Sequence, residues 1–345
     1  MSPPAEERRV SVVIINHNGM RRLPGTLDSV LNCGWPLAEI VVVDDGSTDR
    51  TLDHVRDFAE AAPFRVVVMD RPEHRGTNAT FGEAIALATG DIIVTCDQDD
   101  RWYPDKITFL VESLEAQPDA FIAFSDAGLI DASGRSIGRS RWRVAGFSPI
   151  EQAAMSRDPL GQMLARRVMS GCTAAIRAEL VPAVLPVPKP LHPSLNEIMY
   201  DHWISLIAAA AGPVVLVSRQ LVDYRIHPRQ QIGIPGLSVR RWAPRMALRA
   251  AQFRASRYEI DRRMEFDSLH VEEIRSRLAR TGLGSEATEH VLDMAHRHLR
   301  SRQALHEDRL RRELVEPGQL LVVKLPVGLW RVAVDRAFQQ GIDIV

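Results

Sequence analysis

The chain has few cysteines, almost no net charge and no long hydrophobic run. Only three of its 345 residues are cysteines, widely spaced and without a C-x-x-C pair, which excludes a disulfide scaffold and favours a reducing cytoplasm. The formal net charge of −1 argues against nucleic acid as a partner, because phosphate binding usually leaves a basic excess. The apolar windows at 204–217 and 320–329 are shorter than the roughly 20 residues that cross a bilayer. The N-terminus is polar, without a visible signal peptide. We therefore expect a soluble cytoplasmic protein, with peripheral contact at the inner face of the cell membrane left open.

The first part of the chain repeats a pattern of strand followed by helix. Short β-branched runs lie at 10–16, 39–45, 65–70 and 91–96. The helix-like stretches that follow them lie near 23–31, 48–62, 78–88 and 104–115. Strands that are apolar throughout are typical of a parallel sheet covered on both faces. The pattern predicts an α/β fold with a doubly wound, mostly parallel sheet, in which ligands bind beyond the carboxyl ends of the strands.

The pattern is less regular after residue 120. Further strands are expected at 121–126, 172–177 and 214–218, with loops between them at 133–148 and 182–193. Long loops inside a compact domain often cover a site. From about residue 237 the sequence consists of amphipathic stretches rich in Arg, Ala and Glu. We therefore divide the chain into a main domain over 1–236 and a C-terminal helical region over 237–345.

Three carboxylates crowd into four residues directly after the fourth strand, in C-D-Q-D-D-R-W-Y-P-D-K. A cap on the next helix would account for one of Asp97, Asp99 and Asp100, but not for all three. A calcium loop would need a glycine at its sixth position and a closing Glu. Mg²⁺ and Mn²⁺ take one or two protein carboxylates and complete their shell with water and substrate phosphates. The D-x-D pair therefore predicts a Mg²⁺ or Mn²⁺ site, and Asp100 is open between a supporting contact and a helix cap.

Polar residues also follow the first two strands. In V-V-V-D-D-G-S-T-D, Asp44 fits either a capping turn or an acceptor for a nucleobase N–H. His17, in N-H-N-G, is either an ordinary turn histidine or a ring that packs on the same base. Both positions lie where the carboxyl ends of parallel strands would meet, so they predict a nucleotide crevice at that edge.

Two later motifs carry further candidates. Asp201, in Y-D-H-W, fits either a helix N-cap or a functional carboxylate. In D-Y-R-I-H-P, after the expected last strand, Arg225 and His227 are ordinary surface residues or a clamp on a diphosphate. His227 as a neutral imidazole is then a third candidate metal ligand.

These motifs, in this order, resemble family-two glycosyltransferases of the glycosyltransferase-A fold over roughly residues 10–235. The resemblance rests on V-S-V-V-I-I-N-H-N-G, V-V-D-D-G-S-T-D, T-G-D-I-I and D-Q-D-D-x-W-x-P-D-K. G-T-N-A-T-F, Y-D-H-W and D-Y-R-I-H-P are most similar to bacterial surface-polysaccharide rhamnosyltransferases. The resemblance implies an inverting, metal-dependent transfer of a sugar, L-rhamnose first, from a nucleoside diphosphate donor (dTDP-rhamnose or a UDP-sugar). The acceptor it implies is a polysaccharide or a lipid-linked glycan.

The resemblance also implies roles for the residues on the donor side. Asp99 would be the direct metal ligand, and Asp97 would contact the ribose or the water shell of the metal. Asp44 and His17 would hold the nucleobase. Many family members carry an A-R-N-x-G run after the third strand, which this chain lacks. Arg75 is the residue that we expect to supply the missing positive charge.

For the chemical step, the resemblance implies that Asp201 is the catalytic base. The family usually has Glu directly before this residue, and Tyr200 stands there in this chain. Asp201 is therefore the single candidate in this motif.

Several alternatives stay open. The donor sugar could be a UDP-hexose or UDP-galactofuranose. A nucleotidyltransferase ranks lower, because its glycine-rich triphosphate loop is absent from N-H-N-G-M-R-R, which has only Gly19. A non-catalytic nucleotide-sugar-binding protein has the same fold requirements. In the C-terminal region, arginines such as 240, 241, 245 and 249, interleaved with Trp242, fit a surface for anionic lipid, a solvated helix face or a homo-oligomer contact.

Overall fold

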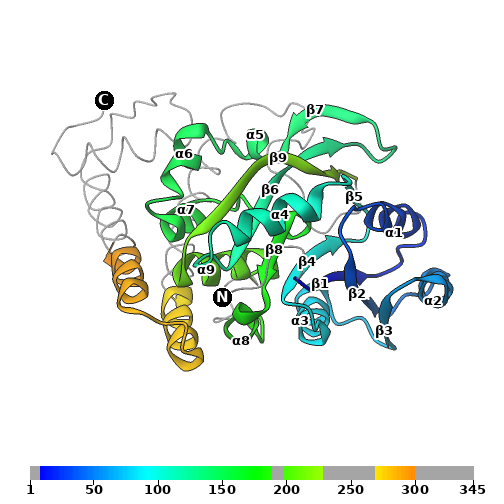
Figure 1. Ribbon diagram of the computed structural model, residues 1–345, viewed down its shortest axis with the longest axis horizontal. Helices are drawn as coiled ribbons and strands as arrows, with labels where there is room; N and C mark the ends of the chain where they lie inside the picture. Colours follow the sequence, from blue (N-terminus) through cyan, green and yellow to red (C-terminus); the bar gives the residue numbers. More distant parts are fainter. Residues whose placement is uncertain (1–7, 189–197, 228–268, 298, 300–345) are drawn as a thin grey trace, which may run out of the picture.

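The computed structural model describes residues 8–188, 198–227, 269–297 and 299. Its strands are β1 (Val10–Asn16), β2 (Leu37–Asp45), β3 (Arg65–Arg71), β4 (Ile92–Asp97), β5 (Arg101–Trp102), β6 (Ile122–Ile130), β7 (Ser136–Ser140), β8 (Ala174–Arg177) and β9 (Val214–Arg225). They form one mixed sheet in the order β3-β2-β1-β4-β8-β6-β9-β5, with β7 paired to β6 (Figure 1). The predicted parallel part is confirmed, since β3, β2, β1 and β4 all run parallel.

The four helices that the sequence predicts between residues 23 and 115 occur with small shifts at their ends, and further helices follow them in the described chain. The labelled helices are α1 (Leu23–Leu31), α2 (Thr51–Ala61), α3 (Thr77–Leu87), α4 (Lys106–Glu115), α5 (Arg141–Ala145), α6 (Pro149–Ala154), α7 (Pro159–Ala165), α8 (Val181–Val184) and α9 (Tyr200–Ala211). α2 begins at Thr51 rather than residue 48, because the carboxylate of Asp49 accepts the N–H of Thr51 at 3.0 Å and holds a turn there. α4 begins two residues after Pro104, once the N–H of Lys106 has closed a turn onto the carbonyl of Tyr103.

Helices cover both faces of the parallel strands, as predicted. Val12 and Ile14 of β1 pack with the buried faces of α1, α2 and α4. Val13, the residue between them, packs with α3, α7 and α9 on the opposite face. Successive side chains of a strand point to opposite faces, so a strand that is buried on both sides needs apolar residues throughout. The sheet therefore has the two covered faces of a glycosyltransferase-A-type fold.

The second half of the sheet differs from the expected strands and loops. β9 is twelve residues long and pairs with β6 as far as Arg225, so D-Y-R lies inside the strand rather than after it. The stretch 133–148, predicted as a loop, contains β7 and the short helix α5. Ser140 caps α5 by accepting the N–H of Arg143. The length of β9 depends on its pairing with β6, more than 90 residues earlier in the sequence, which local sequence does not reveal.

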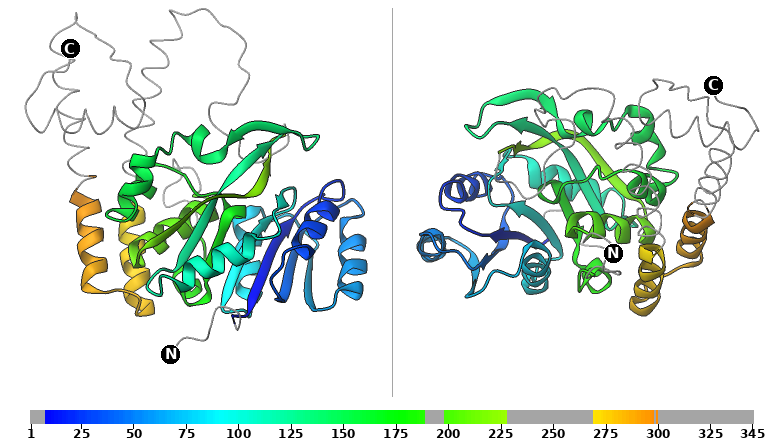
Figure 2. Two further views of the ribbon diagram at one scale, coloured as in Figure 1. Left: turned by 45° about the horizontal axis from the view of Figure 1, so that its top comes forward. Right: turned by 180° about the vertical axis from the view of Figure 1, so that it is seen from behind.

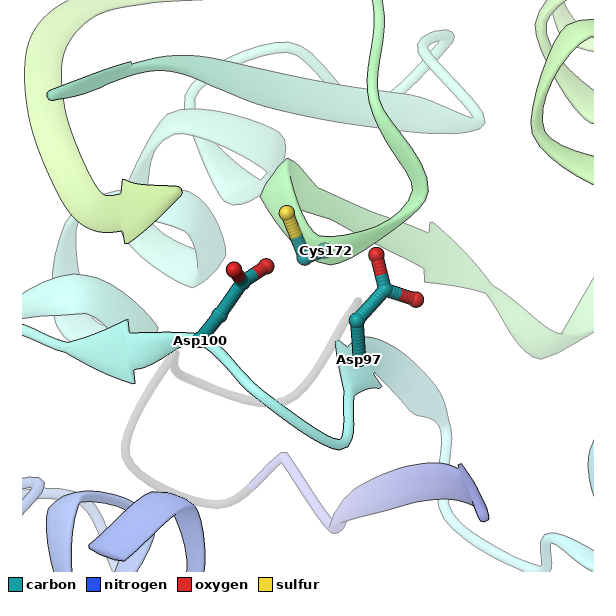
Figure 3. Close-up of side chains that lie close together, drawn as sticks. All are labelled: Asp97, Asp100 and Cys172. Carbon is teal, nitrogen blue, oxygen red and sulfur yellow. The ribbon is translucent and has the colours of Figure 1, made fainter. Parts of the chain in front are cut away.

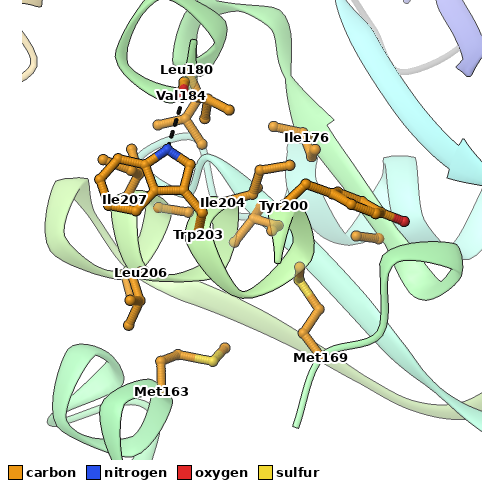
Figure 4. Packing of buried hydrophobic residues seen from close by; sticks show 14 of the residues in the cluster. Met163, Met169, Ile176, Leu180, Val184, Tyr200, Trp203, Ile204, Leu206 and Ile207 are labelled. Carbon is orange, nitrogen blue, oxygen red and sulfur yellow. Dashed lines mark hydrogen bonds between the residues drawn. The ribbon is translucent and has the colours of Figure 1, made fainter. Parts of the chain in front are cut away.

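A large apolar core surrounds α9. The side chain of Trp203 is fully buried, and its indole N–H donates to the carbonyl of Val184 at 2.9 Å (Figure 4). The helices 269–281 and 286–297 share this core, to which they contribute Val271 and Leu292, respectively. They lie at the end of the molecule opposite α1 and α2 (Figures 1 and 2).

This packing bears on the expected division of the chain. Part of the predicted C-terminal region, 237–345, is helical and continuous with the core of the main domain. The boundary at 236 and the arginines at 240, 241, 245 and 249 lie outside the described residues, so these predictions stay open. Among the described helices, none has both the length and the apolar character to cross a membrane.

Candidate functional site

A pocket of about 540 Å³ opens beyond the carboxyl ends of β1 and β4. Residues from both halves of the sheet line it. The candidates that the sequence predicted and that line the pocket are His17, Asp97, Asp99, Asp201, Arg225 and His227. Asp44 and Arg75, two other predicted residues, are not among the lining residues. The motifs at 97–102, 200–203 and 223–227, up to 130 residues apart in the sequence, thus meet at one site.

Asp44 lies directly beneath the pocket, at the end of β2. Its carboxylate accepts the amide N–H of Asn16 at 2.6 Å, and the backbone N–H and hydroxyl of Ser47 at 2.8 and 2.6 Å. These bonds tie the end of β1 to the turn after β2. A Cβ atom at Gly19 would collide with the side chains of Asn16 and Gln98, so a larger residue at this position would displace them. Contact between Asp44 and a nucleobase stays a prediction.

The neighbouring Asp45 lines the pocket instead. It accepts the backbone N–H groups of Arg75 and Gly76 at 2.8 and 2.9 Å, and the His74 ring lies 2.8 Å from it. Burial alone would raise the pKa of Asp45, but these hydrogen bonds lower it below the usual value. The carboxylate is therefore a stable anion. Arg75 serves this contact through its backbone, and its guanidinium lies 3.7 Å from Glu83.

Two imidazoles stand side by side at the same edge. His17 and His74 have ring centroids 4.5 Å apart, tilted by 40°. Nδ1 of His17 lies 2.9 Å from the carbonyl of Asp45, and its backbone N–H donates to Gln98 at 2.9 Å. The rings face the pocket with apolar and hydrogen-bonding surface, which suits a planar heterocycle.

Hydrogen bonds and an ion pair link the acidic loop after β4 to the end of β9. Arg225 donates from its backbone to the carboxylate of Asp100 at 3.0 Å, and from its guanidinium to the carbonyl of Asp99 at 2.8 Å. Arg101 forms an ion pair with Asp223, to which its Nε donates at 2.9 Å. Each of these contacts spans more than 120 residues of sequence, and together they make one rigid acidic edge.

Asp99 lies beside His227, whose imidazole the sequence suggested as a third metal ligand. Nε2 of His227 lies 2.6 Å from Oδ2 of Asp99, and both side chains line the pocket. Asp97 lines the same pocket. Two carboxylates and a neutral imidazole form a donor set that suits Mn²⁺ and, less fully, Mg²⁺. Among the described residues, however, the three possible ligand atoms that lie within 4.8 Å of one another belong to Asp97, Asp100 and Cys172, so ligation by Asp97, Asp99 and His227 together stays a prediction.

Asp97 is held by the tyrosine that precedes Asp201. The hydroxyl of Tyr200 donates to Oδ1 of Asp97 at 3.2 Å, and its ring stacks on Phe81 with centroids 3.6 Å apart. A Cβ atom at Gly171 would collide with the Tyr200 hydroxyl. Burial, followed by the charges of Asp99 and Asp201, raises the pKa of Asp97 to about 7. A metal ion would remove this cost, because it stabilises the carboxylate.

Asp201 lies in the first turn of α9 and lines the same pocket. It is not the N-cap of α9, which is Met199. Burial raises the pKa of Asp201, and the charges of Arg167 and Arg141 partly counteract that rise. A carboxylate with a raised pKa is a stronger base than an ordinary surface aspartate.

The sequence reasoning missed some residues that line the pocket. Asp45 and His74 lie next to predicted positions, but local sequence does not tell which of two adjacent side chains faces the pocket. Arg141 comes from the stretch 132–148, which contains four arginines and no acidic residue. That composition was the available signal for a basic side chain at the site.

The comparisons with known proteins agree with this geometry. Residues 11–180 match the model of the family described as glycosyl transferase family 2. These residues, just under half of the chain, are similar to a glycosyltransferase family 2 domain. Several relatives are named glycosyltransferases. The match also agrees with the resemblance inferred from the motifs. The family description names no sugar, so it does not distinguish rhamnose from other donor sugars.

Two relatives illustrate the match. An uncharacterized glycosyltransferase of Nostoc sp. (strain PCC 7120) is 28% identical over 228 residues, which are 64% of this chain and 65% of that protein. A putative teichuronic acid biosynthesis glycosyltransferase of Bacillus subtilis is 33% identical over 119 residues, 34% of this chain and 46% of that protein. The chain thus spans less than two thirds of the length of these relatives.

Solved structures share the fold. A mannosyltransferase from Pyrobaculum calidifontis, in complex with GDP-Man and Mn²⁺, has a TM-score of 0.50 at 19% identity, covering 98% of this chain and 83% of its own. S. aureus TarS 1-349, in complex with UDP-GlcNAc, has a TM-score of 0.50 at 16% identity, covering 77% and 66%. At these identities the likeness concerns the fold alone.

Proposed function

We propose that the protein is an inverting, metal-dependent glycosyltransferase that moves a sugar from a nucleoside diphosphate donor to a glycan or lipid-linked acceptor. The observation that carries the proposal is the meeting of Asp201 with the acidic loop in one pocket, between the histidine pair and Arg225. A nucleotide sugar needs these three parts at one place: a surface for the base, positive charge for the diphosphate, and a carboxylate near the acceptor hydroxyl.

On the donor side, His17 and His74 offer ring surface to the base, with Asp45 behind them. Asp44 fixes the two loops that carry these groups. Arg225 lines the pocket beside the acidic loop and supplies a guanidinium to the diphosphate. Asp97, Asp99 and His227 would hold a Mg²⁺ or Mn²⁺ ion. That ion supplies positive charge that stabilises the departing nucleoside diphosphate.

On the acceptor side, Asp201 takes the proton from the attacking hydroxyl. Inversion requires attack from the face opposite the diphosphate, so the base must stand across the sugar from the acidic loop. The raised pKa of Asp201 increases its affinity for that proton. Arg141 and Arg167 stabilise its anionic form before the step. Tyr200 is a positioning residue, because it acts through Asp97.

The proposed sugar is L-rhamnose from dTDP-rhamnose, used for a cell-envelope polysaccharide at the cytoplasmic face of the membrane. This choice rests on the similarity of G-T-N-A-T-F, Y-D-H-W and D-Y-R-I-H-P to rhamnosyltransferases. UDP-hexose and UDP-galactofuranose are the alternatives. The Bacillus subtilis relative, named for teichuronic acid biosynthesis, supports a cell-envelope product.

A donor screen tests the proposal. Purified protein with Mn²⁺ is incubated with dTDP-rhamnose, UDP-glucose, UDP-galactofuranose or GDP-mannose, and release of the nucleoside diphosphate is measured with and without acceptor polysaccharide. We expect release from one donor, greatest from dTDP-rhamnose, and its loss when EDTA removes the metal. A nucleotidyltransferase would instead release pyrophosphate from a nucleoside triphosphate and a sugar phosphate. Donor binding without release in any arm would contradict the proposal and indicate a binding protein.

A further inference from the structure

A buried thiol lies against two of the three carboxylates of the acidic loop. Cys172, in the 3₁₀ turn Gly171–Thr173, points its sulfur toward the carboxylates of Asp97 and Asp100 (Figure 3). One potential ligand atom from each residue lies within 4.8 Å of the other two. Cys172 is 0% exposed and Asp100 is 2% exposed, whereas Asp97 lines the pocket. The cluster is thus a closed recess whose entrance is Asp97.

Asp100 is the member of this cluster whose carboxylate is only partly hydrogen-bonded. Oδ1 of Asp100 accepts the backbone N–H of Arg225, whereas no N–H or O–H group donates to the buried Oδ2, and the Cys172 thiol lies beside this carboxylate. Buried polar atoms in folded proteins are almost always satisfied, and each exception needs an explanation. This oxygen is buried, and the carboxylate that carries it lies close to Cys172 and Asp97 (Figure 3). A cation in the recess would satisfy it.

We propose that Asp97, Asp100 and Cys172 form a binding site for a thiophilic divalent cation of the Zn²⁺ type. Thiolate sulfur selects Zn²⁺ over the hard ions Mg²⁺ and Mn²⁺, which prefer oxygen. Two carboxylates and one thiolate make three protein ligands, and the fourth position of a tetrahedral Zn²⁺ would face the pocket through the Asp97 side. This set differs from Asp97, Asp99 and His227, which contain no sulfur.

The surroundings of the thiol suit such a site. Nζ of Lys106 donates to the carbonyl of Cys172 at 2.7 Å and lies 3.3 Å from the centre of the Trp102 ring. This contact fixes the turn that carries the thiol. Burial, followed by the charges of Asp100 and Asp97, raises the pKa of the Cys172 thiol, and the charge of Lys106 counteracts part of that rise. In the metal-free protein the thiol holds its proton. Binding therefore breaks the S–H bond, forms the S–Zn bond with the sulfur electron pair, and releases the proton to water.

The two metal sets share Asp97, so they exclude each other. A Zn²⁺ ion in the recess would remove Asp97 from the Mg²⁺ or Mn²⁺ set and block sugar transfer. This consequence, unlike the site itself, rests on the proposed function. We expect Zn²⁺ to inhibit transfer in the presence of Mn²⁺, and Cys172→Ser to relieve the inhibition.

Co²⁺ is the direct probe, because Co²⁺ bound to thiolate absorbs in the near ultraviolet and Co²⁺ bound to oxygen or imidazole alone does not. Metal-free full-length protein titrated with Co²⁺ should develop this absorption with a one-to-one end point, and Zn²⁺ should abolish it. Cys172→Ser should lose the absorption. Asp100→Asn should keep it but need about 10-fold more Co²⁺. Cys33→Ser, at another buried free thiol, is the matched control and should behave as the unmodified protein.

Absence of the thiolate absorption in the unmodified protein, or its persistence in Cys172→Ser, would overturn the proposal. Thermal unfolding of Cys172→Ser and Cys172→Ala shows whether a variant loses the absorption because it is misfolded. A misfolded variant has a lower melting temperature, whereas a correctly folded one loses only the absorption. The readout requires no sugar transfer, so failure of the proposed function leaves it unchanged. Conversely, a missing absorption leaves Mn²⁺-dependent donor turnover unaffected.

Discussion

Two carboxylates at the same edge of the sheet have opposite electrostatic surroundings. Asp45, at the end of β2, is surrounded by N–H donors from Arg75 and Gly76, and its pKa is lowered. Asp97, at the end of β4, is surrounded by other carboxylates, and its pKa is raised to about 7. The first anion is satisfied by the protein alone, whereas the second needs an additional cation. The difference divides the pocket into a preformed side and a side that, in the proposed function, a metal ion would complete.

The division follows the architecture. The Asp45 side belongs to the parallel strands β1 to β3, whose contacts join segments about 30 residues apart. The Asp97 side joins the loop after β4 to α9 and β9, more than 100 residues away. A preformed side suits recognition of a constant part of the ligand. A metal-completed side suits the charges that change during a reaction.

The largest effect is expected at Asp201, which tests whether the base belongs to the second side. Asp201→Asn keeps the shape but removes the proton acceptor, so we expect the transfer rate to fall by about 10²- to 10⁴-fold. Donor nucleotide affinity, measured by calorimetry, should stay within about twofold, because the first side is intact. The exposed Asp53 on α2 provides the control variant, Asp53→Asn. Transfer that survives in Asp201→Asn would place the base elsewhere.

Tyr200→Phe tests how the second side is positioned. The change removes the hydroxyl that donates to Asp97 and keeps the ring that stacks on Phe81. A single hydrogen bond to a charged group contributes about 1.5–3 kcal/mol, so we expect the Mn²⁺ concentration for half-maximal turnover to rise about 10-fold. Tyr103→Phe, which removes a hydroxyl that donates to Asp223, is the matched control. An unchanged Mn²⁺ dependence would show that Tyr200 serves packing alone.

The smallest effect concerns the stability of the metal-free protein, where the two carboxylates should respond to pH in opposite directions. Because the pKa of Asp97 is raised from 3.8 to about 7, the folded protein keeps a proton that the unfolded chain releases within that window. Its contribution to stability is therefore lost as pH rises from 4 to 7. With EDTA at pH 8, Asp97→Asn should raise the melting temperature by about 2 °C or more, with no gain at pH 4.

For Asp45 the sign is reversed, since its lowered pKa gives stability at neutral pH that is lost in acid. Asp45→Asn should therefore lower the melting temperature at pH 8 in the same experiment. If Asp97→Asn also destabilised the protein at pH 8, the contrast between the two carboxylates would be wrong.

The same division explains how much the sequence could predict. The strand and helix pattern of residues 10–115 was confirmed almost element by element, because apolar runs and turn residues are local signals. The acidic loop was found for a similar reason, as three adjacent carboxylates have few structural uses. That Asp201, Arg225 and His227 meet this loop followed from the family resemblance, and the structure brings all of them into one pocket.

What the sequence could not reveal depends on register and distant pairing. The length of β9 depends on its pairing with β6, so Arg225 was expected beyond a strand that in fact contains it. Asp44 and Asp45 are identical neighbours, and only the strand register decides which one faces the pocket. The thiol of Cys172 lies close to Asp97 and Asp100 although more than 70 residues of sequence separate them, and no sequence motif predicts this proximity.

The central claim is that the acidic loop holds the divalent ion on which sugar transfer depends. The most direct test is Asp99→Ala, assayed by release of nucleoside diphosphate across a Mn²⁺ titration, with Asp53→Ala as the control. Loss of a group that stabilises developing charge costs about 10²- to 10³-fold in rate. We predict a loss of this size that saturating Mn²⁺ does not restore. Full turnover in Asp99→Ala, with the Mn²⁺ dependence of the unmodified protein, would contradict the account.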